Sequence, residues 1–132
     1  MIRISKLADY GTVILAFLAK KPKEAFSAKE VAHATHIALP TVSKLLKQLA
    51  KTALIYSKQG VKGGYYLGKS SKDISLADII NALDGGVALT ECSLAGGKCV
   101  VEKNCAIRQQ FKGISEIVNE VLNKVSLSEM LG

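Results

Sequence analysis

Outside one segment of sixteen residues, the sequence has no cysteine. That segment, TECSLAGGKCVVEKNC (90–105), holds Cys92, Cys99 and Cys105, the three cysteines of a 132-residue chain. An odd number of thiols cannot all pair, which excludes the complete disulfide framework of a small secreted protein. Three thiols gathered in one place instead indicate metal binding or redox chemistry.

The sequence also lacks low-complexity tracts, a targeting signal and an apolar run long enough to cross a membrane. The apolar stretch YGTVILAFLA (10–19) is too short for a bilayer and is not followed by a signal-peptide cleavage site. Because 48% of the residues are hydrophobic, we expect one folded domain with a substantial core, in the cytoplasm and without a membrane partner.

Motifs of common catalytic sites are missing as well. The chain has no phosphate-binding glycine loop, no HExxH zinc motif and no nucleophile and base at a recognisable spacing. We therefore expect a protein that is not an enzyme and has no small-molecule substrate.

Acidic residues are scarce in the first part of the chain. Residues 1–72 contain 13 Lys and Arg against 3 acidic residues, whereas residues 73–132 contain 5 against 8. The formal net charge of +7 therefore arises in the N-terminal part. Such a split is typical of a polyanion-binding region joined to a region with another role. A lysine face that only improves solubility is the alternative.

Three helices are predicted in this basic part. The first spans 5–21, where apolar residues recur on one helical face. The second, SAKEVAHAT (27–35), begins with Ser27 and has Glu30 three residues later, the pattern of a capping box. After a short turn, the third spans 40–54 and has Pro40 at its first position. Its apolar face is Val42, Leu45, Leu46 and Leu49.

The second and third helices fit a helix-turn-helix, and the β-rich stretch LIYSKQGVKGGYYLG (54–68) after them fits a basic hairpin, the wing of a winged helix. Short polar side chains at the start of the third helix would reach base edges, and lysines would meet phosphates. An ordinary amphipathic helix and an ordinary hairpin are the alternatives. The predicted DNA contacts are Pro40, Thr41, Ser43, Lys44, Lys47, Lys58, Gln59, Lys62 and Gly63.

Two further helices are predicted in the second part of the chain, over 75–86 and 105–125. The latter has apolar residues at alternating steps of four and three, which favours a coiled-coil-like pair with a second copy. A two-fold dimer would present two winged helices to a pseudo-palindromic operator. Packing on its own domain is the alternative, favoured by Ile117 and Leu122. The predicted dimer contacts are Ile107, Phe111, Ile114, Val118, Val121 and Val125.

In this order the segments PTVSKLLKQLAKTALI, KGGYYLGKSSKDISLADIINALDG and the three-cysteine stretch resemble the winged-helix iron-sulfur regulators typified by IscR and NsrR. Within that family, ISLADIINALDGGVALTEC is most similar to the branch that regulates the Suf system of iron-sulfur cluster assembly. The resemblance implies a mainly α fold with a small β-hairpin and a long C-terminal dimerisation helix. The expected organisation is a winged helix-turn-helix (1–72), a linking helix and turn (73–91), a cluster-binding loop (92–105) and a dimerisation helix with a short C-terminal helix (105–132).

The resemblance further implies that Cys92, Cys99 and Cys105 hold an iron-sulfur cluster, of the 2Fe-2S or the 4Fe-4S type. Chemistry alone leaves iron-sulfur, zinc and unligated thiols open, because the spacing differs from that of CxxC pairs. Where IscR-like members have a histidine ligand, this chain has Arg108, which cannot bind a metal. NsrR-like members use an acidic residue of the first helix, and Asp9 of the partner subunit matches it. The remaining candidates are Glu91, Glu102, His33 and His36.

The implied function is a repressor whose operator affinity depends on whether the cluster is bound, and which controls cluster-assembly genes. Gln59 and Ser43 stand where IscR-like members have an arginine and a glutamate, so we expect a different operator. Two competing functions stay open: a DNA-binding regulator with structural zinc and no sensing, and a small iron-sulfur redox protein whose basic part binds an acidic partner.

Overall fold

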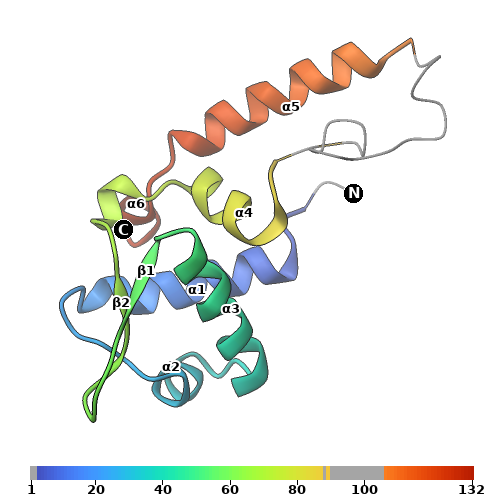
Figure 1. The fold of residues 1–132 in the computed structure, drawn as a ribbon. Helices are drawn as coiled ribbons and strands as arrows, with labels where there is room; N and C mark the ends of the chain where they lie inside the picture. The colour runs from blue at the N-terminus through green and yellow to red at the C-terminus, as the bar shows by residue number, and fades with distance from the viewer. Residues whose placement is uncertain (1–2, 88, 90–105) are drawn as a thin grey trace.

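The computed structural model describes residues 3–87, 89 and 106–132. In this part of the chain the elements follow one another as helices α1 to α3, a two-stranded hairpin, a short 3-10 helix η1 and helices α4 to α6 (Figure 1). The helices are α1 Lys6–Lys20, α2 Ala28–Thr35, α3 Leu39–Lys51, η1 Ser71–Asp73, α4 Leu76–Asp84, α5 Arg108–Asn123 and α6 Leu127–Met130, and the strands are β1 Ile55–Lys58 and β2 Gly64–Leu67. The mainly α fold with a small hairpin and a long C-terminal helix is confirmed.

Side-chain caps explain where several helices begin. At α2, the Ser27 hydroxyl accepts from the Glu30 N–H and the Glu30 carboxylate accepts from the Ser27 N–H, so the predicted capping box is present. The helix ends at His36, whose φ of 62° is left-handed and turns the chain sharply into α3. This tight turn sets the angle between the two helices.

Helix α3 packs its apolar face into the main core. Val42, Leu45, Leu46 and Leu49 are fully buried, as predicted. The helix begins one residue earlier than the sequence suggested, with Ala38 as its N-cap, so that Pro40 occupies the second helical position. A proline is tolerated there because the first N–H groups of a helix have no partner within the helix.

The hairpin is antiparallel, with Ile55 opposite Leu67 and Lys58 opposite Gly64. Its second strand is also tied to the α1–α2 connection, because Phe26 and Tyr65 exchange two backbone hydrogen bonds of 2.9 and 2.7 Å. Gly64 makes this close approach feasible: it has a φ of +146°, and a Cβ there would collide with the backbone of Phe26. The wing is thus held from both sides at its base.

The C-terminal end of the chain returns to the winged helix. The N–H of Leu76 donates to the Val125 carbonyl at 2.9 Å, and the N–H of Leu127 donates to the Ile74 carbonyl at 2.7 Å. Leu127 is fully buried in the same core as α1 and α3. Helix α5 is therefore attached at its C-terminal end to the domain that carries the wing.

Helix α5 lies along α4 and has two different apolar faces (Figure 1). Ser115 is buried, and Leu122 with the following Val125 packs on a second cluster formed by Ala8, Leu76 and Ile80. Four apolar side chains on the helix or at its start are instead exposed by 45 to 61%: Ile107, Ile114, Ile117 and Val121. Of the two residues that favoured the alternative of packing on the same domain, Ile117 is exposed and Leu122 faces inward.

Candidate nucleic-acid interface

The outer face of α3 presents the start of the helix and a row of lysines. Pro40, Lys44 and Lys47 are exposed, and Thr41 and Ser43 are half-buried. The helix has no side-chain N-cap and no acidic residue in its first turn. Its first N–H groups, with the positive end of the helix dipole, therefore point outward without an acidic side chain beside them, which suits a phosphate.

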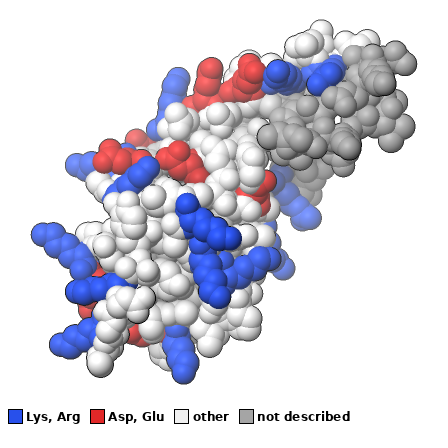
Figure 2. All heavy atoms as spheres, viewed as in Figure 1, with Lys and Arg blue, Asp and Glu red and all other residues white. Residues whose placement is uncertain are grey.

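The lysines of this region have no carboxylate partner among the described residues. There, the recorded ion pair is Lys21 with Glu24, at 3.7 Å between two exposed side chains. On the face shown in Figure 2, basic side chains predominate in the lower half of the molecule, around the winged helix, whereas most acidic side chains lie in the upper half with basic ones among them. An unpaired set of like charges favours a polyanion, because binding relieves the repulsion among the lysines.

The wing adds a second basic surface beside α3, on which β1 packs. Lys58, Gln59 and Lys62 are exposed, and Gly63 is half-buried. A side chain at Gly63 would collide with the Lys58 carbonyl, so this glycine shapes the turn rather than presenting a contact group. The predicted DNA contacts therefore lie on two neighbouring elements.

Lys23 belongs to this surface and was not among the predicted contacts. It lines a groove of about 400 Å³ between the α1–α2 connection and the wing, together with Lys58, Lys62 and Val61. Glu24 and Glu30 line it too, but Glu24 is paired with Lys21 and Glu30 caps α2. The sequence contains the lysine but carries no signal that residue 23 lies beside residue 62.

The first turn of α1 forms a separate surface of mixed charge. Asp9 is exposed and lines a hollow of about 810 Å³ with Asp84 and the basic residues Arg3 and Lys6. The Ser5 hydroxyl caps α1 and donates to Asp84 at 2.6 Å, which joins the start of α1 to the end of α4. Asp9 does not cap α1, because its cap is Ser5.

The remaining candidate ligands do not gather around Asp9 within the described part of the chain. His33 and His36 are exposed on and after α2, which Figure 1 places at the lower end, away from the first turn of α1. The three cysteines, Glu91 and Glu102 lie outside the described residues. In residues 3–87, 89 and 106–132, no three His, Cys, Asp or Glu side chains are grouped to hold a metal ion.

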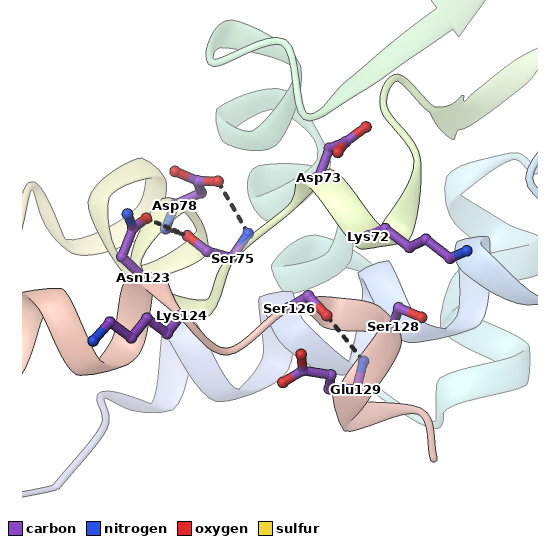
Figure 3. A pocket seen from close by; sticks show the side chains of 9 residues that line it. All are labelled: Lys72, Asp73, Ser75, Asp78, Asn123, Lys124, Ser126, Ser128 and Glu129. Atoms are coloured by element: carbon purple, nitrogen blue, oxygen red, sulfur yellow. Dashed lines mark hydrogen bonds between the residues drawn. The ribbon is translucent and has the colours of Figure 1, made fainter.

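A polar hollow of about 530 Å³ marks the joint between α4 and the end of α5 (Figure 3). The Ser75 hydroxyl donates to Asn123 Oδ1 at 3.0 Å, and the Ser75 N–H donates to Asp78 at 3.0 Å. Ser126 caps α6 by accepting from the Glu129 N–H. Two lysines and three carboxylates line the hollow, so it has no strong preference for either sign of charge. The Ser75–Asn123 hydrogen bond joins the start of α4 to the end of α5.

The sequence model of one family, Rrf2, described as iron-dependent transcriptional regulators, matches residues 4–132. The chain belongs to the Rrf2 family. Among curated relatives, the regulator IscR of Klebsiella pneumoniae strain 342 is 33% identical over 95 residues, which are 72% of this chain and 58% of the relative. The match thus spans little more than half the length of that protein.

Solved structures of Rrf2-type regulators have the same fold over almost the whole chain. CymR, described as the global cysteine regulator of B. subtilis, is 28% identical, with a TM-score of 0.77 over 99% of this chain and 97% of that one. IscR of T. potens is 27% identical, with a TM-score of 0.72 over 98% and 86%. The winged-helix prediction and the family resemblance are confirmed, and the named relatives are regulators, not enzymes.

The donor set of this Rrf2 chain fits an iron-sulfur cluster. Three cysteine sulfurs are the soft ligands that iron-sulfur clusters use, and Asp9 is an exposed carboxylate that a second copy could approach.

Among the described residues no helix is long and apolar enough to cross a membrane.

Proposed function

We propose that this Rrf2 protein is a homodimeric, DNA-binding repressor that responds to the state of an iron-sulfur cluster held by Cys92, Cys99 and Cys105. Its targets would be genes of Suf-type cluster assembly, and it would act in the cytoplasm. The observation that carries the DNA-binding part is the unpaired lysine surface formed by the outer face of α3 and the neighbouring wing. The family description as iron-dependent regulators supports the sensing part.

Dimerisation is supported by the outer face of α5. Ile107, Ile114 and Val121 recur at intervals of seven residues and are exposed in the single chain, although exposed apolar side chains in such a row cost free energy in water. Phe111, Val118 and Val125, the other half of the predicted seam, are half-buried within the chain. A second copy would cover the exposed row, and the two-fold axis would give the operator its pseudo-palindromic form.

Signal transfer follows from how α5 is attached. Its C-terminal end is held to the winged helix by the Ser75–Asn123 hydrogen bond and by buried Leu127. Its N-terminal end follows the cysteine segment directly in the chain. When bound, an iron-sulfur cluster supplies a link between the three thiolates that iron limitation or oxidants can remove. A change of tilt at the start of α5 would then reach the spacing of the two winged helices through the rigid joint.

The test is anaerobic reconstitution of the full chain, followed by gel shift on the DNA upstream of its own gene, with and without the cluster. We expect a coloured protein with stoichiometric iron and sulfide, and a difference in operator affinity between the two forms. A colourless protein that contains zinc would contradict sensing and support the structural-zinc regulator. A coloured protein without salt-sensitive DNA binding would support the redox protein instead.

The Cys92→Ala variant separates cluster binding from its consequence. It should lose the colour and the cluster-dependent change in affinity, while an unrelated substitution at half-buried Ser128 in α6, Ser128→Ala, should keep both. If Cys92→Ala loses the colour and the wild-type affinity is the same with and without the cluster, the linkage between the two is absent and the sensing mechanism fails.

The likeness to CymR favours a second candidate, a regulator that responds to cysteine supply. CymR matches nearly the whole length of the chain with a TM-score of 0.77. In that case operator affinity would change with added cysteine, and it would not change on cluster loading. The same gel shift, repeated with cysteine in place of iron and sulfide, distinguishes the two.

A further inference from the structure

The tip of the wing carries an apolar side chain that the fold does not use. Val61 is the most exposed of the large hydrophobic residues described, with a relative exposure of 107%. It belongs to neither of the two core clusters. Removing its side chain would therefore cost the folded protein almost nothing, and its role lies outside the folding of this chain.

The turn itself does not call for valine. The N–H of Gly63 donates to the Gly60 carbonyl at 3.0 Å, which closes a four-residue turn with Val61 and Lys62 at its two central positions. Neither central residue has a positive φ, and such turns accept most residues at these positions, so the backbone does not select valine. Gly60, with a φ of +110° and open space around it, places the two side chains at the outermost point of the hairpin.

The surroundings of Val61 are positively charged. It lines the same groove as Lys23, Lys58 and Lys62, which have no carboxylate partner in the described part of the chain. Glu24 and Glu30 line the groove as well, but Glu24 pairs with Lys21 and Glu30 caps α2, so the unpaired charges beside Val61 are lysines. An apolar group beside unpaired lysines fits a polyanion that also offers an apolar surface in a narrow channel. The minor groove of DNA has both properties: phosphates on its rims and a floor of base edges and sugars.

The base of the wing is rigid enough to aim this tip. Two backbone hydrogen bonds join Phe26 to Tyr65, and the rings of Tyr56 and Tyr66 pack at 6.1 Å between centroids. The position of the tip relative to α3 is thus set by the fold and does not have to be gained on binding.

We infer that Val61 is a specificity-determining residue that contacts the floor of the minor groove and selects A·T over G·C base pairs there. The reason is chemical. A G·C pair presents the 2-amino group of guanine in the minor groove, whereas an A·T pair presents acceptors alone. An isopropyl group over that amino group would remove its water without offering an acceptor, which costs free energy. The narrower groove of A·T tracts also brings the phosphates nearer to the lysines.

This inference rests on the proposed function, namely that the dimer binds duplex DNA. The test begins with a pool of duplexes containing random base pairs, from which the anaerobically purified full chain and its Val61→Thr variant each enrich their preferred sites. Threonine has the shape of valine but a hydroxyl that can accept from guanine. We expect a symmetric pair of positions at which the wild type enriches A·T and Val61→Thr does not.

Base analogues then isolate the 2-amino group on an enriched duplex. Replacing adenine by 2,6-diaminopurine at those positions adds the amino group and leaves the major groove unchanged. In a duplex with G·C at the same positions, replacing guanine by inosine removes the amino group. Wild-type binding should weaken about tenfold when diaminopurine replaces adenine and strengthen when inosine replaces guanine, in the range expected for a disfavoured base pair. Val61→Thr should change less than about twofold. Val13→Thr, a matched change at an exposed valine of α1, should behave as the wild type.

The outcomes separate the two claims. If the wild type binds the adenine and diaminopurine duplexes equally, or if Val61→Thr discriminates as strongly as the wild type, the role of Val61 is refuted while DNA binding stands. If the wild type shows no salt-sensitive duplex binding, the proposed function falls and the inference falls with it.

Discussion

The winged helix and α5 are both rich in apolar residues, but they use them differently. In α3 the apolar side chains are fully buried and the outer face is polar and basic. In α5 one apolar face packs on α4 while a second row stays exposed. The first pattern belongs to an element that is complete within one chain and offers charge to its partner. The second is the pattern expected of an element that packs on a partner, as in the proposed dimer.

The largest effect is expected where the two regions share a core. Leu127 comes from the C-terminal helix but is fully buried beside residues of α1 and α3. Leu127→Ala should lower the free energy of unfolding by about 2 to 5 kcal/mol, as for other buried leucines. Urea unfolding with the matched change at exposed Leu131 as control measures this. Equal stability of the two variants would mean that the C-terminal end is not part of the core.

The next effect breaks the wing and leaves α5 untouched. Gly64 and Gly60 both have a positive φ. In Gly64→Ala the new Cβ meets the Phe26 backbone, whereas in the control Gly60→Ala it meets open space. We expect Gly64→Ala to cost roughly 1 to 3 kcal/mol more than its control because of the collision. It should also weaken DNA binding in gel shifts while dimerisation by ultracentrifugation is unchanged. Equal losses in both variants would show that φ alone decides.

The third change affects α5 and spares the winged helix. Val121 is 56% exposed and belongs to the row that would pack in the dimer, so Val121→Asn should leave thermal unfolding nearly unchanged. Loss of this apolar side chain from both copies should raise the dimer dissociation constant about tenfold or more, since each loss of about 1.4 kcal/mol in the free energy of association raises it tenfold. Analytical ultracentrifugation measures this, with Met130→Gln on α6 as the exposed control. An unchanged constant would place the dimer contact elsewhere.

The smallest effect is expected from a single lysine of the DNA face. Lys47→Gln should reduce the slope of log affinity against log salt by about 1, because one phosphate contact is lost. Lys124→Gln, in the joint beneath α5, removes the same charge away from that face and should leave the slope unchanged. Equal changes in both would mean that net charge, not position, governs binding.

Local patterns predicted the elements well, because their causes lie within a few residues. The predicted capping box of Ser27 and Glu30 is present, and a helix lies within the predicted range 75–86, with Ser75 and Asp78 forming a capping box at its start. The buried face of α3 followed from helical periodicity. Lys44 and Lys47 were recognised from the same period, since residues opposite the apolar face must point outward.

Contacts between distant segments were beyond local patterns. The heptad seam of α5 suggested one interface, but the structure turns Val118 half inward and Ile114 outward. The residues around Lys23 do not indicate that it lies beside the wing. Those around Ser75 do not indicate its hydrogen bond to Asn123, forty-eight residues away. Val61 was visible as a valine between glycine and lysine, but only its exposure showed that the fold leaves it unused.

The amino-acid sequence by itself determined the helices, the hairpin, the basic N-terminal part and the three thiols, since periodicity, caps and charge act over short distances. Only the tertiary structure decided which face of α5 is covered by its own chain and which lysines share a groove. It also decided that Val61 at the wing tip packs on no other part of the described chain. These depend on the packing of segments far apart in the chain, where close contact, and not local propensity, sets the outcome.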